Sequence, residues 1–321
     1  MGYLIGKLRR AVFGISPREA LFSCRGFPRG ASEAQVHLER AGMTFVSGYN
    51  AALQETNPQL LMSVLNRNDR ELVGFAFEGA AMGLAILDLI TPWNRSRVAA
   101  FLKGTGAQHV YMVHVGTGWA LARLKRPINP YLERMDPILR WLVMDGYGFH
   151  QGYFHWKRFI EHREVPANVS GYATRVFDQG LGRALWFVHA ADVERIPAAV
   201  GDFDVSRQAD LWSGVGLACA YAGKVTLSEL KQLRAVAKPY QPQLAQGAAF
   251  AAKARLLAGN ATEYMDQACR ELCGVTAQMA AKFTDKALEN LPVDGDQPAF
   301  EVWRLRLHEI FATSTLEKIE S

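Results

Sequence analysis

A short glycine-rich frame recurs along the chain at a nearly constant interval, and this repeat limits the possible folds more than any other feature. The frame is Gly-x-[Gly/Ala]-x-[Ala/Gly/His], and its first residue stands at Gly79, Gly116, Gly146, Gly180, Gly214 and Gly247. The mean interval of about 34 residues is the length of one helix-turn-helix unit. The sequence therefore predicts an all-α fold made of repeated helical hairpins.

The segments around each frame have the character of helices. Prolines such as Pro127, Pro166 and Pro239 fall between the expected helices, where they do not interrupt helical hydrogen bonds. The valine-rich run 109–114 could instead form a strand, but the frame continues through it and favours a helix. Small residues at the first and third frame positions lie on opposite sides of a helix, which indicates a helix pressed between two neighbours. Two arrangements stay open, a tetratricopeptide-like superhelix and a closed α/α toroid.

The size and composition of the chain suit one large domain. Its 321 residues are 49% hydrophobic and 21% charged, which is typical of a soluble globular protein. A chain of this length can bury a core without a disulfide or a metal ion. We expect an N-terminal helical arm over residues 1–30, followed by a single α-helical repeat domain over residues 31–321.

Charge and cysteine content restrict the partners and the compartment. The net charge of +5 comes from 36 basic and 31 acidic residues spread along the chain, so we expect no nucleic-acid partner. The four cysteines form no CxxC pair and no secretory signal is evident, which favours a cytoplasmic protein with reduced thiols.

Two segments could concern a membrane. The apolar stretch 74–90 carries Glu78 and Asp88, which favours a buried helix over a membrane span. The N-terminal residues form a basic amphipathic pattern. For this helix we prefer packing on its own domain, with contact to a membrane surface as the alternative.

A third helix face remains for a ligand after the two small faces are used for packing. The residue before each frame and the residue four positions later both point to this face. The first series reads Glu78, Val115, Asp145, Gln179, Ser213 and Gln246, and the second reads Met82, Trp119, Phe149, Arg183, Leu217 and Phe250. Polar and aromatic groups on one face are what a repeat fold offers to a ligand.

Glu78 and Asp145 are the candidate catalytic residues. Each stands among small or apolar residues, where desolvation would raise the pKa of a carboxyl group, so they could serve as general acid and base. The structural alternative is that each carboxylate pairs with a basic group such as Arg183.

The candidate substrate-binding residues surround this pair. Gln179, Arg183 and Trp186 share one helix face and could hold a carboxylate, a phosphate or a thioester carbonyl, although a structural arginine is an equal alternative. The other candidates are Trp119, Phe149, His150 and Gln246. His150 and His155 lack the spacing of helical metal ligands, so we predict no metal site. The sequence identifies no cofactor.

A succession of longer motifs resembles a known family. The motifs are GI (14–15), RGF (25–27), FEGAAM (77–82), HVGTGW (114–119), DGYGFHQGYF (145–154), FDQGLGRALWF (177–187), LWSGVGL (211–217) and LAQGAAF (244–250). Over residues 10–280 this succession resembles the UnbL-like family of enediyne biosynthesis proteins, a domain of unknown function.

The resemblance implies an accessory protein in the maturation of an enediyne-type or other polyunsaturated polyketide. Its partners would be a polyene or polyketide intermediate and other proteins of the same pathway. We expect the protein to bind and act on a long unsaturated intermediate in a groove lined by the repeats. The alternative is a non-catalytic helical-repeat scaffold that binds a partner protein or a pathway intermediate. A toroidal enzyme like the lanthionine cyclases is disfavoured, because the chain shows no such zinc ligand set.

Overall fold

The computed structural model describes residues 2–29, 32–91, 93–133 and 135–316. Every regular element within these residues is a helix, which confirms the predicted all-α class. The run 109–114 is helical as well, because the 3₁₀ helix η2 (Ala107–His109) leads directly into α7 (Val110–Arg123).

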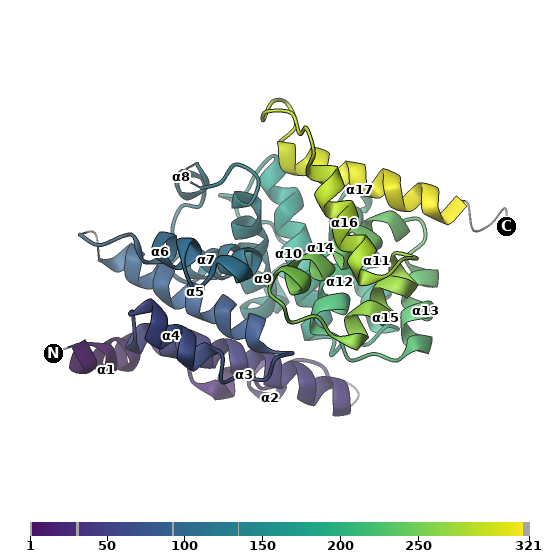
Figure 1. The fold of residues 1–321 in the computed structure, drawn as a ribbon. Helices are drawn as coiled ribbons and strands as arrows, with labels where there is room; N and C mark the ends of the chain where they lie inside the picture. The colour runs from purple at the N-terminus through teal and green to yellow at the C-terminus, as the bar shows by residue number, and fades with distance from the viewer. Residues whose placement is uncertain (1, 30–31, 92, 134, 317–321) are drawn as a thin grey trace.

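A row of long helices forms the body of the protein (Figure 1). Its members are α3 (Ser32–Gln54), α5 (Val73–Ile90), α7, α9 (Arg140–Phe154), α10 (Tyr172–Val188), α12 (Val205–Ala222) and α14 (Gln241–Leu257). Each helix packs mainly on the one before it and the one after it.

Neighbouring helices in this row run parallel. A Cβ atom added to Gly148 of α9 would lie 2.3 Å from the carbonyl oxygen of Phe177 in α10. One turn later, a Cβ atom on Gly152 would lie 2.6 Å from the Cβ atom of Ala184. The contacts therefore advance in the same direction along both helices, and the other neighbouring pairs follow the same order.

Shorter segments return the chain between the parallel helices. They are α4 (Pro58–Leu65), α6 (Arg97–Lys103), α8 (Asn129–Leu132), the π-helical η3 (Lys157–Glu161), α11 (Arg195–Gly201), α13 (Leu227–Val236) and α15 (Glu263–Leu272). The last helices, α16 (Ala277–Leu288) and α17 (Ala299–Leu316), pack on α14. Each long helix of the row from α3 to α14 is thus followed by a shorter connecting segment.

The row also coils back on itself. The Nε2 atom of His37 in α3 lies 2.7 Å from the carbonyl oxygen of Ala222 at the end of α12. The guanidinium of Arg70 donates a hydrogen bond of 2.8 Å to the carbonyl oxygen of Gly259, which follows α14. Early and late helices of the row therefore meet, and side chains fill the axis of the coil.

Frame glycines make these helix contacts, as their spacing predicts. A Cβ atom on Gly146 would lie 2.0 Å from the carbonyl oxygen of Val115 in the preceding helix. Gly118 of that preceding helix faces the carbonyl oxygen of Val143 in return, also at 2.0 Å. The joints between α9 and α10, α10 and α12, and α12 and α14 repeat this reciprocal pattern. Such an approach admits a hydrogen atom and no larger group, and it permits Cα–H···O contacts between the backbones.

Helix α5 lies in the core, as predicted for the apolar stretch 74–90. Among the described residues it is the one helix with the length and apolar composition that a membrane span would need, and 83% of it is buried inside the protein. Its Asp88 carboxylate accepts hydrogen bonds from the backbone N–H groups of Arg97 and Val98, so it caps the start of α6.

The first residues of the chain pack on α3 through α1 (Gly2–Phe13), the 3₁₀ helix η1 (Pro17–Ala20) and α2 (Phe22–Arg25). Ile15, Phe22 and Phe27 are buried in the common core. The side-chain amide of Asn50 bonds to both the N–H and the carbonyl of Ile15, which fixes this segment on α3. The division into an arm and a repeat domain stays a prediction.

We expect Gly146→Ala to lower the free energy of unfolding by about 1–3 kcal/mol, because its methyl group would overlap the carbonyl oxygen of Val115. The matched control is Gly201→Ala in α11, where nothing lies within 4 Å of the added Cβ atom. The control should be neutral or stabilising by up to about 1 kcal/mol. Urea unfolding followed by circular dichroism measures both changes, and equal stability of the two variants would contradict the glycine joints.

Candidate active site

The polar residues that precede the frames meet on the axis of the coil and bond to one another. The carboxylate of Asp145 accepts a hydrogen bond of 2.8 Å from the side-chain amide of Gln179. The hydroxyl of Ser213 lies 3.2 Å from Gln179 Oε1 and 2.8 Å from Gln246 Oε1. Four successive helices of the row thus contribute one polar group each to a continuous buried chain.

Arg183 lies between the two candidate catalytic carboxyl groups. Its Nη1 atom donates a short hydrogen bond to Asp145, and its Nη2 atom is 3.8 Å from Glu78 Oε1. The guanidinium also lies 4.5 Å from the ring centroid of Phe149. Arg183 is one helical turn beyond Gln179 in α10, so both side chains reach the same side of Asp145. Glu78, Asp145 and Arg183 are all buried.

Glu78 is the member of this group that lacks hydrogen bonds in the part of the chain that the structure describes. Its side chain is fully buried, and neither carboxylate oxygen has a hydrogen-bond partner among the described residues. Burial raises the pKa of Glu78 to about 7, the charge of Arg183 opposes this rise, and Asp145 adds to it. The indole of Trp119 contributes a weaker interaction that also lowers the pKa, outside ordinary hydrogen-bond geometry. Near neutral pH, Glu78 can therefore hold or release a proton.

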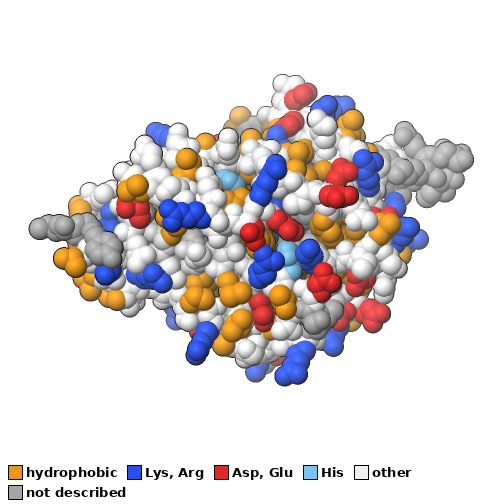
Figure 2. Space-filling model, turned by 60° about the horizontal axis from the view of Figure 1, so that its bottom comes forward, with side chains coloured by type: hydrophobic (Ala, Val, Ile, Leu, Met, Phe, Trp, Pro, Cys, Tyr) orange, Lys and Arg blue, Asp and Glu red, His pale blue; other side chains and the backbone are white. Residues whose placement is uncertain are grey.

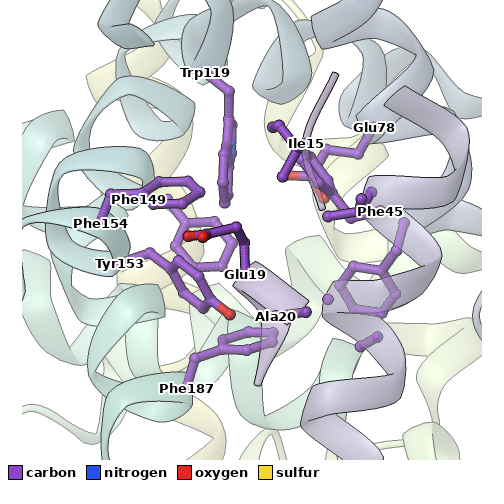
Figure 3. A pocket seen from close by; sticks show the side chains of 14 residues that line it. Ile15, Glu19, Ala20, Phe45, Glu78, Trp119, Phe149, Tyr153, Phe154 and Phe187 are labelled. Carbon is purple, nitrogen blue, oxygen red and sulfur yellow. The ribbon is translucent and has the colours of Figure 1, made fainter. Parts of the chain in front are cut away.

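A small apolar cavity, called here the aromatic cavity, adjoins Glu78 (Figure 3). Its volume is about 30 Å³. The aromatic side chains around it come from α3, α5, α7, α9 and α10, and they are Phe45, Phe75, Trp119, Phe149, Tyr153, Phe154 and Phe187. Figure 3 shows Trp119, Phe149 and Tyr153 on one side of this space and Glu78 and Phe45 on the other.

A second cavity lies on the other side of Arg183, and it is called here the inner cavity. Its volume is about 40 Å³, and both Asp145 and Arg183 line it together with Leu217, Phe250 and other side chains of α7, α12 and α14. Glu78 lines the aromatic cavity and Asp145 lines the inner cavity. The two carboxyl groups therefore face different spaces, with Arg183 between them.

The segment after α1 closes the aromatic cavity. Ile15, Glu19 and Ala20 belong to its lining, and Glu19 forms a short ion pair with Arg25. These residues were not predicted from the sequence, because they stand outside the repeated frame. Only the apolar residues Ile15, Phe22 and Phe27 in this segment offered a signal, and that signal was weak.

A second ionic cluster continues the polar chain, and the repeated frame did not predict it either. Arg304 of α17 bonds to Asp210 of α12 and to Glu301, and its Nε atom lies 3.5 Å from Gln246 Oε1. Arg175 of α10 bonds to the same two carboxylates. Two cations balance two anions, so this cluster fixes α17 against the row of helices.

The remaining predicted residues have different positions. Trp119 and Phe149 line the aromatic cavity, whereas His150 and Trp186 line neither cavity. His150 packs edge-on against Trp119, and burial lowers its pKa to about 3, so the imidazole is neutral at ordinary pH. Gln246 lies in the polar chain. Roles of His150, Trp186 and Gln246 in substrate binding stay predictions.

Within the described ranges, no three His, Cys, Asp or Glu side chains gather as metal ligands would.

A protein-family model described as a protein of unknown function (DUF1702) matches residues 4–311. The chain belongs to this family. The DUF1702 match includes the N-terminal segment that closes the aromatic cavity, all the glycine joints and most of α17. No match was found among curated proteins or among solved structures. Nothing in the family description concerns enediyne biosynthesis.

The raised pKa of Glu78 predicts a pH-dependent stability. Its pKa rises from 4.5 to about 7 on folding, so its contribution to stability is fully present below pH 4.5 and is lost as the pH rises to about 7. The loss is about 3 kcal/mol. Because Glu78→Gln cannot ionise, we expect its unfolding free energy relative to the wild type to increase by a similar amount between pH 4.5 and pH 8.

Urea unfolding at the two pH values measures this difference. The control is Glu133→Gln, which neutralises an exposed carboxyl group and should follow the wild type. A Glu78→Gln variant that parallels the wild type at both pH values would show that Glu78 ionises normally.

Proposed function

We propose that the protein binds a long unsaturated intermediate of an enediyne-type or other polyunsaturated polyketide in the aromatic cavity and transfers a proton on it. The observation that carries this proposal is Glu78, a fully buried carboxyl group that has no hydrogen-bond partner among the described residues and lies beside a cavity lined by aromatic rings. The resemblance of the motifs to the UnbL-like proteins supports the substrate class. The reaction would take place in the cytoplasm, beside the polyketide synthase that supplies the intermediate.

The chemistry of the site suits the migration of a double bond. Glu78 in its protonated form donates a proton to one end of a conjugated system, and the carboxylate then removes a proton from a carbon further along. The product is an isomer of the substrate, so the step consumes no oxidant or reductant. Aromatic faces such as those of Trp119 and Phe149 stabilise the positive charge that develops on the chain between the two proton transfers.

Asp145 and Arg183 would then be positioning residues. Hydrogen bonds from Gln179 and Arg183 already engage both oxygens of Asp145, while neither oxygen of Glu78 accepts a hydrogen bond from the described residues. Asp145 holds the guanidinium of Arg183 near Glu78, and the positive charge of Arg183 keeps the pKa of Glu78 from rising further. Of the two predicted catalytic residues, Glu78 would therefore exchange the proton and Asp145 would orient Arg183.

Substrate entry requires a change in the N-terminal segment. The aromatic cavity of about 30 Å³ is far smaller than the roughly 300–1,000 Å³ of ordinary ligand sites. Since Ile15, Glu19 and Ala20 close it, displacement of residues 15–20 would join the cavity to the outside. The hydrogen bonds of Asn50 to Ile15 would be lost in this step.

The second candidate function is a non-catalytic scaffold for a partner protein or a pathway intermediate. The small volume of both cavities favours it, because neither holds a long chain in the present conformation. In that case the buried polar chain serves stability alone.

The test is mass spectrometry of the products of an iterative polyene-forming polyketide synthase, expressed with and without this protein in H₂O and in D₂O. In H₂O we expect a new isomer with the same mass as the product formed without the protein. In D₂O we expect this isomer to carry one deuterium more than the product formed in D₂O without the protein. Glu78→Gln should abolish this isomer without loss of thermal stability, and Glu133→Gln should retain it. A product profile that does not respond to the protein would contradict the enzymatic proposal and favour the scaffold.

A further inference from the structure

Helix α1 exposes an apolar face that no other part of the described chain covers. Its opposite face is tightly packed, because a Cβ atom on Gly6 would lie 2.2 Å from the carbonyl oxygen of Gln54 at the end of α3. Leu4, Leu8 and Val12 are 71%, 65% and 64% exposed, although they are large apolar side chains. They follow one another at intervals of four residues and therefore form a single stripe along the helix.

Two further segments adjoin α1 at this end of the protein. The loop after α5 leads to Arg97, the first residue of α6, whose charge lowers the pKa of Arg9 in α1 after the larger effect of burial. The end of α7 is connected through Tyr49, whose hydroxyl donates a hydrogen bond to the carbonyl of Phe13 and whose ring lies 5.9 Å from the guanidinium of Arg123. The parallel order of α3, α5 and α7 explains this, because the same ends of these helices meet here.

The charge of this end is strongly positive. Residues 2–14, 91–97 and 121–128 contain eight basic residues and no acidic one, whereas the whole chain has 36 basic and 31 acidic residues. One of the eight, Arg97, forms an ion pair of 3.0 Å with Asp88 at the end of α5. The acidic residue at the end of α3 is Glu55, and its carboxylate already accepts the N–H group of Asn57. Figure 2 shows hydrophobic and basic side chains together at its left end, where α1 lies in Figure 1.

Trp93 completes the surface. It stands in the loop after α5 and is 83% exposed. No other aromatic side chain that the structure describes is as exposed. Tryptophan favours the boundary between lipid headgroups and acyl chains, since its ring is apolar and its N–H group is polar.

We propose that this end of the protein docks on the surface of an anionic lipid bilayer. Helix α1 lies in the plane of the interface, its stripe of Leu4, Leu8 and Val12 enters the acyl boundary, and Trp93 lies at the level of the headgroups. The basic residues of the three segments attract the lipid phosphates. A second copy of the chain is the poorer occupant, because a symmetric contact would bring eight basic residues of each copy together.

The position of the surface also connects it to the aromatic cavity. The segment that closes the cavity begins directly after α1, at Ile15. An apolar intermediate dissolved in the bilayer would therefore meet the cavity next to the docked helix. This connection rests on the proposed function, whereas the docking itself does not.

The experiment is cosedimentation of the purified full chain with large unilamellar vesicles, without any polyketide present. One set contains 30% phosphatidylglycerol in phosphatidylcholine, and the other contains phosphatidylcholine alone. We expect binding to the anionic vesicles that decreases at least tenfold in 0.5 M NaCl and at least tenfold on phosphatidylcholine alone.

Variants separate the apolar stripe from nonspecific adsorption. The double variant Leu4→Gln/Leu8→Gln should bind at least tenfold more weakly, with unchanged thermal unfolding because both side chains are exposed. The matched control Val293→Gln replaces an exposed apolar residue elsewhere in the chain and should bind as the wild type does.

Three results would overturn the proposal. They are a wild type that stays in the supernatant with anionic vesicles, a double variant that sediments like the wild type, and a dimer in sedimentation velocity that the double variant abolishes. Because no substrate is present, failure of the proposed reaction leaves this measurement unaffected, and the reverse also holds.

Discussion

The contact on which the structure depends is the approach of a glycine to the backbone carbonyl of a neighbouring helix. At successive joints an added Cβ atom would lie about 2 Å from a carbonyl oxygen, as at Gly180 against Asp145 and at Gly214 against Gln179. This approach sets the spacing of the parallel helices and therefore the narrow radius of their coil. A narrow coil leaves little room for water on its axis apart from the inner cavity of about 40 Å³, so most side chains that point there must satisfy one another.

The axis meets this requirement almost everywhere. Asp145, Gln179, Ser213 and Gln246 bond in sequence, and the chain continues to the charge-balanced cluster around Arg304. Buried polar groups without partners are uncommon and destabilising. On this axis, Gln246 Nε2 and both carboxylate oxygens of Glu78 lack a hydrogen-bond partner among the described residues. Of these two residues, Glu78 adjoins the cavity whose lining is aromatic. A site that gives up stability in this way is a candidate for function.

The frame predicted the helix joints and the shared face of the residues before it, because both follow from helical geometry over a few residues. It gave no signal for Arg304 with Asp210, which lie 94 positions apart, or for Ile15 and Glu19, which close the aromatic cavity. These contacts join segments with no common period. Composition likewise showed basic residues spread along the chain, while the fold brings Arg97 near Arg9 of α1 and Arg123 onto the ring of Tyr49 at the same end of the protein.

The sequence by itself determined the all-α class, the glycine joints and the group of Glu78, Asp145 and Arg183, since each depends on the angular spacing of residues within one helix. Only the tertiary structure decided that Glu78 and Asp145 face different cavities on either side of Arg183. It also decided that no other part of the described chain covers the apolar stripe of α1. The physical reason is that the coiling of the row fixes which helices meet across its axis and at its ends, and no local pattern encodes that coiling.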